Sequence, residues 1–334
     1  MTIKEVARAA GVSVATVSRV LNDSGPVNPD TRSRVQAAAG SLRYIPHGGA
    51  RSLITSRTNT LGVLLPDLYG EFFSEVIRGI DLTAKRNGYH LLVSCAHDDR
   101  SEIEAALRAM RGRVDGLIVM SPDIDAASLV ANLPDSQPVV LLNCAATDGA
   151  VDSLTIDNVG GARMMVRHLI GHGCRRVAII GGAERNLDAR ERLRGYRAAL
   201  REAGIARDPT LELPGDFTEA SGFDAARRLV RLHPRPTAIF AANDSMAIGA
   251  LSALREAGVR VPEDVAVAGF DDIPIARYMS PPLSSVHVPI AELGEHAMRK
   301  LLAALGNRNG HARRQEMLAT TLVIRDSCGA PGHA

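Results

Sequence analysis

Cysteine and long apolar runs are scarce in this chain, and their scarcity excludes several classes of protein. The 334 residues include four cysteines and no Cys-x-x-Cys pair: Cys95, Cys144, Cys174 and Cys328. Such scattered thiols predict a reduced protein without a disulfide framework or a zinc site. No apolar run approaches the roughly 18 residues of a membrane span, and the start Met-Thr-Ile-Lys-Glu contains no apolar signal core. We therefore expect a cytoplasmic protein with no membrane partner.

Motifs for catalysis are missing as well. Gly181-Gly182 follows an apolar run, but neither Gly-x-Gly-x-x-Gly nor a Walker lysine accompanies it. His168 and His172 are four residues apart, as zinc ligands are on a helix, yet they lack the intervening glutamate and a third ligand nearby. No Gly-x-Ser-x-Gly turn presents a serine nucleophile. These absences predict a protein that is not an enzyme and holds no metal or cofactor.

Charge is divided unevenly along the chain. Residues 1–57 contain eight basic and three acidic side chains, a net charge of +5, whereas the whole chain carries +2. Residues 58–334 are therefore mildly acidic, with a net charge of −3. A basic head on an acidic body is the charge distribution of a protein that binds nucleic acid with its head alone.

Two short helices joined by a glycine turn are predicted at the N-terminus. Thr2 and Glu5 form a capping box that starts the first helix, Gly11 provides the turn, and Ser13 caps the second helix. The side chains that face inward at helical spacing are Ile3, Val6, Ala7 and Ala10, followed by Val17, Val20 and Leu21. This pattern is typical of a helix-turn-helix. The alternative is an ordinary α-hairpin within a larger domain.

The second helix leaves four side chains pointing outward, and a third helix follows it. The outward residues are Val14, Ala15, Thr16 and Arg19. The three smaller side chains let the backbone approach base edges, and the arginine can reach guanine or phosphate. Asn28 caps the third helix, which begins at Pro29 and ends with Tyr44-Ile45-Pro46.

Residues 2–58 resemble the headpiece and hinge of the lactose-repressor/galactose-repressor family. The resemblance is carried by Thr2-Ile3-Lys4-Glu5-Val6-Ala7, Gly11-Val12-Ser13, Thr16-Val17-Ser18-Arg19-Val20-Leu21-Asn22, Tyr44-x-Pro46 and Ala50-Arg51-Ser52-Leu53. It implies that Asn22, Tyr44, Ala50 and Arg51 join the outward residues of the second helix in binding DNA. It also implies that residues 48–56 form a hinge helix on operator DNA, where Leu53 wedges into the minor groove. Gly48-Gly49 departs from the larger residues usual there, and each glycine weakens a helix by about 1 kcal/mol.

Short apolar runs alternate with amphipathic helices after residue 59. One set of strands is predicted at 61–65, 91–93, 116–120, 139–142 and 153–156, and a second set at 177–180, 238–241 and 265–268. Strands that alternate with helices predict parallel sheets. An internal echo predicts two similar lobes, because Gly88 follows Gly79 by nine residues just as Gly204 follows Gly195.

The resemblance implies that these lobes form an effector domain with the periplasmic sugar-binding fold. The predicted fold class is α/β, with an all-α helix-turn-helix headpiece followed by the two-lobed effector domain. The expected domains are a headpiece at 1–46, a hinge at 47–58, and an effector-binding and dimerisation domain at 59–334. Ligands of open α/β sheets bind at the carboxyl ends of the strands.

Polar residues follow several of the predicted strands at those ends. By the resemblance, the effector-contacting residues are Phe73, Asn143, Arg192, Phe217, Asn243 and Asp271, and Phe72 adds to the stacking surface. Arg192 and Asp271 are expected to form a charged pair across the cleft that bridges vicinal hydroxyls. The alternative is that Asn243 and Asp271 cap the following helices, and for Asp244 capping is the preferred interpretation.

The sequence predicts a homodimeric transcriptional repressor that binds a pseudo-palindromic operator. A small carbohydrate or sugar acid is the expected effector that releases it. A purine-like co-repressor is the alternative, because either sign of coupling uses the same two lobe arrangements. The alternative from a different class is a sugar-binding or sugar-modifying protein with purely structural N-terminal helices. We expect a cytoplasmic, nucleoid-associated protein, and the C-terminal tail has no leucine heptads for a tetramerising coiled coil.

Overall fold

The residues described by the computed structural model are 1–23, 25–44, 57–96, 100–122, 137–144, 151–307 and 311–329. The chain divides into an N-terminal unit, residues 1–60 with 113–115, and a main unit, residues 61–112 with 116–334. The predicted hinge helix at 48–56, with Ala50, Arg51 and Leu53, lies outside the described residues. None of the helices in the described ranges is long and apolar enough to cross a membrane.

Three helices make up the N-terminal unit, and they begin where the capping residues predict. The Thr2 amide donates to the Glu5 carboxylate (2.6 Å), and Gly11 adopts a left-handed backbone conformation at φ 63°. The Ser13 hydroxyl accepts a hydrogen bond from a backbone amide (3.1 Å), and the Asn28 side chain accepts another (2.9 Å). The helices are α1 (Ile3–Ala10), α2 (Val14–Asn22) and α3 (Pro29–Ser41).

Small aliphatic side chains form the core of the N-terminal unit. Val6, Val17 and Val35, one from each helix, are fully buried at its centre. Helix α3 ends at Ser41, earlier than predicted, because Arg43 adopts a left-handed backbone conformation at φ 46° before the chain reaches Pro46. The predicted helix-turn-helix fold is otherwise confirmed.

The first lobe of the main unit contains a six-stranded sheet. Its elements are β1 (Thr60–Leu65), α5 (Glu71–Arg86), β2 (His90–Cys95), α6 (Arg100–Met110), β3 (Leu117–Met120), β4 (Val139–Leu142), β5 (Asp152–Ile156), α12 (Ile290–Gly306) and β11 (Gln315–Leu318). The strand order is β11-β5-β4-β3-β1-β2, and β1, β3, β4, β5 and β11 run parallel. Strands β3 and β4 are buried along their whole length.

The second lobe repeats this plan. Its elements are α8 (Asn158–Gly171), β6 (Val177–Ile180), α9 (Leu187–Glu202), η1 (Pro209–Leu211), β7 (Glu212–Leu213), α10 (Glu219–Leu229), β8 (Ala238–Ala241), α11 (Asp244–Glu256), β9 (Ala266–Asp271), η2 (Pro274–Tyr278), β10 (Ser284–His287), β12 (Thr321–Val323) and η3 (Asp326–Cys328). The strand order is β12-β10-β9-β8-β6-β7, parallel except for β12. Both lobes therefore have the predicted parallel α/β architecture.

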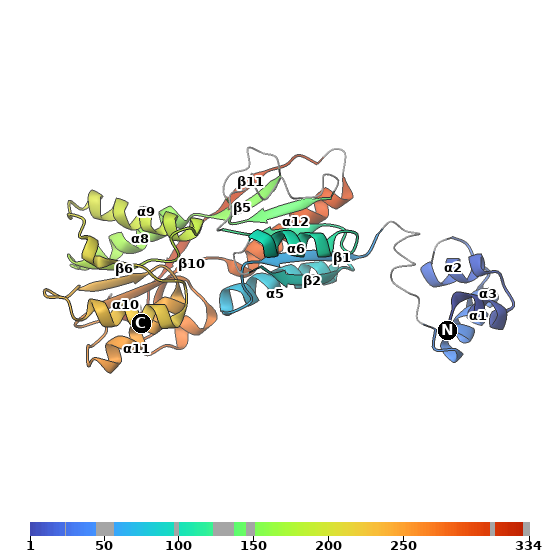
Figure 1. Cartoon of the computed structure of the whole chain (residues 1–334), viewed down its shortest axis with the longest axis horizontal. Helices are drawn as coiled ribbons and strands as arrows, with labels where there is room; N and C mark the ends of the chain where they lie inside the picture. Colours follow the sequence, from blue (N-terminus) through green and yellow to red (C-terminus); the bar gives the residue numbers. More distant parts are fainter. Residues whose placement is uncertain are drawn as a thin grey trace. The chain divides into compact units, whose positions relative to one another are not determined.

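The chain crosses between the two lobes three times. It passes from β5 to α8, returns from β10 to α12, and crosses again from β11 to β12. Figure 1 shows the red α12 among the blue and green elements of the first lobe. The sequence predicted two consecutive sets of strands and none of the elements from β10 onward. Neighbours distant in the chain decide which sheet these late elements join, so periodicity could not reveal it.

The first glycine of each pair in the internal echo lies where two helices meet closely, whereas Gly88 and Gly204 have open space around them and a left-handed backbone conformation. A Cβ on Gly79 of α5 would stand 2.0 Å from the Ala291 carbonyl oxygen of α12, and a Cβ on Gly195 of α9 would stand 2.4 Å from the Val159 carbonyl oxygen of α8. Each lobe thus has a helix pair whose backbones touch through a glycine. The echo marks equivalent packing positions in two similar lobes.

We predict that Gly195→Ala destabilises the protein by about 2–3 kcal/mol, because the new methyl group must push two packed backbones apart. Gly171, at the end of α8, has open space around its Cβ position and is the matched control. Gly171→Ala should change the free energy of unfolding by less than about 1 kcal/mol. Urea unfolding of both variants checks this, and equal midpoints would contradict the packing argument.

Candidate functional site

The first candidate site is the outer face of α2 in the N-terminal unit. Val14 is 40% exposed, and Ala15 and Arg19 are also exposed. Thr16 is partly buried, with its Oγ1 2.9 Å from Ser13 Oγ. The four predicted base-reading side chains therefore lie on the first turns of α2, clear of the valine core. Small side chains with one arginine on a projecting helix suit major-groove contact.

Two other predicted DNA-binding residues have different surroundings. The Asn22 amide donates to Ser18 Oγ (3.2 Å) at the end of α2. Tyr44 is partly buried and packs against the apolar core of the N-terminal unit. The structure thus places Asn22 on the same helix as the outward residues and gives Tyr44 a packing contact.

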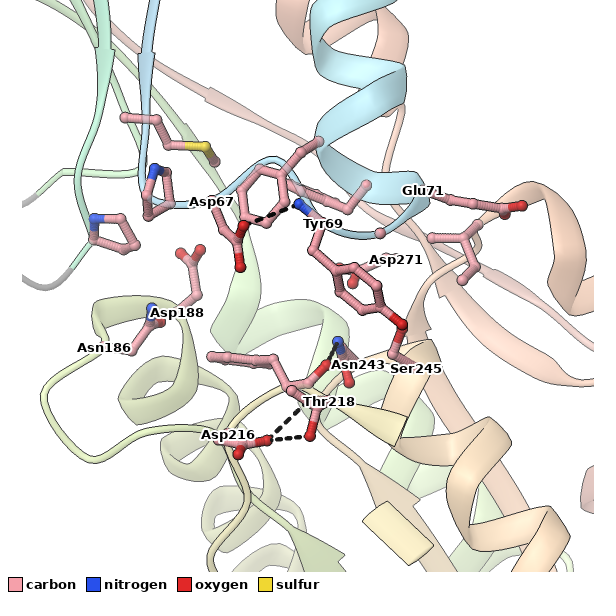
Figure 2. Close-up of a pocket in the computed structure, with 18 of the residues that line it drawn as sticks. Asp67, Tyr69, Glu71, Asn186, Asp188, Asp216, Thr218, Asn243, Ser245 and Asp271 are labelled. Atoms are coloured by element: carbon pink, nitrogen blue, oxygen red, sulfur yellow. Dashed lines mark hydrogen bonds between the residues drawn. The ribbon is translucent and has the colours of Figure 1, made fainter. Parts of the chain in front are cut away.

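The second candidate site is a cavity of about 180 Å³ in the main unit. Residues of both lobes line it, and Figure 2 shows them around one space, with the Glu71 carboxylate directed away from the other labelled side chains. The lining residues follow the carboxyl ends of β1, β3, β6, β7, β8 and β9, as expected for an open α/β sheet. Six of the seven predicted effector residues are among them: Phe72, Phe73, Arg192, Phe217, Asn243 and Asp271.

Arg192 is the polar centre of this cavity and is only 3% exposed. Its Nε donates to Asn158 Oδ1 (2.9 Å), and its Nη1 donates to the carbonyl oxygen of Ala242 (2.5 Å). Its Nη2 lies 3.2 Å from Asp271 Oδ1, and its guanidinium stacks 3.8 Å above the Phe270 ring. A buried guanidinium needs such partners, because removing a charge from water is costly.

The pair of Arg192 and Asp271 lies within the second lobe, on α9 and at the end of β9. The predicted pairing across the cleft is therefore wrong, because both side chains reach the cavity from the same lobe. Asp271 Oδ1 is buried and within ion-pair distance of the guanidinium, yet it accepts no hydrogen bond from the part of the chain that the structure describes. This oxygen therefore has unused acceptor capacity beside the cavity that Asp271 lines.

Asn143 does not line the cavity, contrary to the prediction. It adopts a left-handed conformation (φ 48°) after β4 of the first lobe, and its Nδ2 donates to Asp188 Oδ2 of the second lobe (3.1 Å). Asp188 Oδ1 accepts from Asn158 (2.9 Å), the residue that also holds Arg192. Asn143 thus links the two lobes through a hydrogen bond to Asp188, a residue that itself lines the cavity. Asp188 and Asn158, which the sequence analysis did not choose, complete the network.

Asn243 caps a helix and also lines the cavity. Its Oδ1 caps α11 by accepting from the Met246 amide (2.9 Å), and its Nδ2 donates to the Phe217 carbonyl oxygen (2.9 Å) at the cavity. Asp244 does not cap the helix, so that expectation is wrong. Its carboxylate is fully buried and accepts hydrogen bonds from Ser285 Oγ (2.6 Å) and the Ile273 amide (2.9 Å).

Aromatic and apolar side chains form the remaining walls. Phe72 and Phe73 pack edge to face, with centroids 5.5 Å apart, at the start of α5 in the first lobe. Phe217 adopts φ 70°, and its ring covers Gly182 so closely that a Cβ there would lie 2.2 Å from a ring carbon. The cavity therefore combines stacking surfaces with a polar network, the usual composition of a small-molecule site.

The described residues contain no cluster of three side chains suited to hold a metal ion. The rings of His168 and His172 lie 4.5 Å apart, and His168 Nε2 is 3.3 Å from Cys328 Sγ. These side chains pack within the second lobe, away from the residues that line the cavity.

Burial controls the protonation of the acids in this network. It raises the pKa of Asp271 to about 7, although Arg192 opposes the increase and Asp188 adds to it. Burial also raises the pKa of Asp188, again against the attraction of Arg192. Both carboxyl groups are thus held in a region where desolvation is stronger than ion pairing.

Comparison with known proteins relates both units to regulators. Residues 2–47 match the family described as bacterial regulatory proteins, lacI family, and residues 166–328 match a periplasmic binding protein-like domain. The chain is 38% identical to the ribose operon repressor of Escherichia coli (strain K12) over 90% of this chain and 92% of the relative. It is 37% identical to the HTH-type transcriptional repressor PurR of Photobacterium profundum, over 98% of each.

A solved structure shows the same arrangement of elements. The lac repressor dimer bound to operator and the anti-inducer ONPF superposes with a TM-score of 0.88 at 30% identity, over 99% of each chain. This similarity extends from the helix-turn-helix through both lobes.

We predict that Asp271 makes the free energy of unfolding fall as pH rises. Its pKa is about 7 in the folded protein and ordinarily 3.8, so between these values the folded state retains a proton that the unfolded chain loses. This contribution is present at low pH and lost as pH rises toward 7. Between about pH 5.5 and pH 7.5, the free energy of unfolding should fall by about 2 kcal/mol more in the wild type than in Asp271→Asn.

Urea unfolding across this pH range measures the difference. Asp224→Asn removes an exposed carboxylate of α10 away from the cavity and should retain the wild-type pH profile. Parallel profiles for the wild type and Asp271→Asn would contradict the assignment.

Proposed function

The chain belongs to the lacI family of bacterial regulatory proteins, and we propose that a small carbohydrate or sugar acid, bound between its lobes, releases it from a pseudo-palindromic operator. It is a DNA-binding transcriptional repressor and not an enzyme. We place it in the cytoplasm as a homodimer, the assembly of the lac repressor structure that it resembles. One helix-turn-helix contacts too few base pairs for specific repression, whereas two match the halves of a palindrome.

The observation that carries the effector proposal is the unsatisfied Asp271 Oδ1 beside Arg192. A sugar hydroxyl is both a donor and an acceptor, so one hydroxyl can donate to this oxygen while a neighbouring hydroxyl accepts from the guanidinium. The Asn243 amide is a further polar group on the same lobe. Phe73 and Phe217 provide apolar surface for the faces of the ring. The ribose operon repressor among the relatives supports the same ligand class.

We propose that lobe closure is coupled to the effector through the Asn143–Asp188 hydrogen bond. Asp188 binds Asn143 of the first lobe with one oxygen and Asn158 of the second lobe with the other. Asn158 in turn orients Arg192. A ligand that moves Arg192 or Asp271 therefore changes the groups that hold the lobes together. Such a differential interaction is what an effector needs to shift the balance between two lobe arrangements.

A purine-like co-repressor is the second candidate, and the similarity to a PurR repressor favours it. Phe72, Phe73 and Phe217 would suit a planar base as well as a sugar ring. The two candidates differ in sign, because a co-repressor strengthens operator binding and an inducer weakens it. Titration of the protein–operator complex with ribose and with hypoxanthine distinguishes them.

The outward residues of α2 are proposed to read the operator. We predict that Arg19→Ala loses about 1–3 kcal/mol of specific binding and relaxes the preference at one base pair per half-site. Arg8, exposed on α1, is the matched control because its replacement removes the same charge from another helix. Binding-site selection should return an unchanged motif for Arg8→Ala. An unchanged motif for Arg19→Ala would refute the assignment.

Effector response should depend on the Arg192–Asp271 pair. We predict that Arg192→Ala and Asp271→Ala each lose the effector-induced change in operator affinity, because a ligand hydroxyl then lacks one charged partner at about 1–3 kcal/mol. Operator binding without effector reports whether each variant is folded and should be retained. Fluorescence anisotropy on a selected operator, with and without sugar, measures both quantities. A full response in both variants would exclude this site.

A further inference from the structure

We propose that the cavity accepts only uncharged ligands and rejects sugar phosphates and sugar acids. This inference rests on the proposed effector function and narrows its ligand class. Five carboxylates line the cavity: Asp67, Glu71, Asp188, Asp216 and Asp271. Arg192 is the sole basic residue among the described residues that do so. The acids come from both lobes, and Figure 2 labels all five; the Glu71 carboxylate is directed away from the other four and accepts from the Ile275 amide (2.9 Å).

Arg192 is not free to bind an anion. Three of its nitrogens already face Asn158, Ala242 and Asp271, and one face of the guanidinium is covered by Phe270. Its remaining N–H groups can donate to a hydroxyl, but a phosphate or carboxylate could pair with its charge only by displacing Asp271. The displaced carboxylate, only 4% exposed, would then stay buried beside a second anion. A neutral hydroxyl causes no such conflict, because it can donate to Asp271 Oδ1 and leave the ion pair in place.

Helix N-termini, the other common anion sites in proteins, are already complemented here. Helices α5, α9, α10 and α11 all begin at the cavity, and each has an acidic residue in its first turn: Glu71, Asp188, Glu219 and Asp244. In three of them a side chain also caps the helix: Asn186, Thr218 and Asn243. The three caps take up backbone donors that would otherwise bind a phosphate, and acidic side chains already occupy the first turns of all four helices.

Two of the lining acids are exposed, and neither forms an ion pair with a basic side chain within the described ranges. Asp67 accepts from the amides of Leu68 (2.6 Å) and Tyr69 (3.0 Å), and Asp216 accepts from the amide and hydroxyl of Thr218 (3.0 and 2.6 Å). Burial opposes ionisation of Asp216, but its hydrogen bonds outweigh this and lower the pKa of its carboxyl group. An anionic ligand would meet like charges from both lobes.

The consequence for regulation is that the repressor binds and responds to a sugar that has not yet been phosphorylated. A transferred phosphoryl group would convert the ligand into a form that the cavity excludes. The regulator would therefore respond to the substrate of a phosphorylation step and not to its product.

The test is calorimetry at pH 8, where Asp271 is ionised, with D-ribose, D-glucose, D-ribose 5-phosphate, D-glucose 6-phosphate, D-ribonate and D-gluconate as probes, and hypoxanthine beside them. The neutral sugar that binds should do so at least about 100-fold more tightly than its phosphate or acid, because two or more like charges face the added anion. Binding of hypoxanthine alone would replace the carbohydrate as effector and leave the uncharged class supported. A phosphate or acid that binds as tightly as its neutral sugar overturns the inference and leaves the proposed function standing. No binding by any neutral probe overturns both.

Charge-removing variants test the physical cause. Asp67→Asn and Asp216→Asn keep Oδ1, the atom that accepts each of the hydrogen bonds above, and remove only the charge. Each variant should reduce, by about tenfold, the ratio of the dissociation constant of the phosphate or acid to that of its neutral sugar. Asp224→Asn, an exposed acid outside the cavity, should leave the ratio unchanged. A ratio that stays at the wild-type value in Asp67→Asn and Asp216→Asn overturns the electrostatic explanation.

Discussion

The burial of one guanidinium organises the effector site. Arg192 is held by four groups from α8, β8 and β9: the Asn158 side chain, the Ala242 carbonyl, the Phe270 ring and the Asp271 carboxylate. Removing one partner of a buried charge costs about 3–5 kcal/mol, so these elements are locked in register with one another. The ion pair leaves Asp271 Oδ1 unsatisfied at the edge of the cavity. A ligand hydroxyl completes the hydrogen bonding that the protein alone leaves open.

The same network extends to the other lobe and so links binding to shape. Asp188 is shared between Asn158 and Asn143, which lie on opposite sides of the cleft. Tyr69 and Glu71 of the first lobe also contact the second lobe, through Glu219 (3.4 Å) and the Ile275 amide (2.9 Å). A few polar contacts therefore hold the lobes together beside the three crossovers of the chain. Small changes near the ligand can therefore shift the equilibrium between two arrangements of the lobes, which is what a regulator requires.

Local sequence signals predicted the elements and much of the site, whereas contacts between distant residues remained hidden. The caps at Ser13 and Asn28 and the apolar runs gave the helices and strands, because these depend on neighbours along the chain. The return of α12 to the first lobe depends on a glycine contact with α5 that no periodicity records. Family resemblance identified Arg192 and Asp271 but missed Asn158 and Asp188. Both of these stand in the first turn of a helix and read as ordinary capping residues.

The central claim is that the Asn143–Asp188 hydrogen bond transmits effector binding between the lobes. The direct measurement is the ratio of the operator dissociation constant with saturating effector to that without effector. It is made for the wild type and for Asn143→Ala, and calorimetry measures effector binding by both proteins separately. The account predicts that Asn143→Ala still binds the effector but that its ratio falls most of the way toward one. A ratio equal to that of the wild type would contradict it.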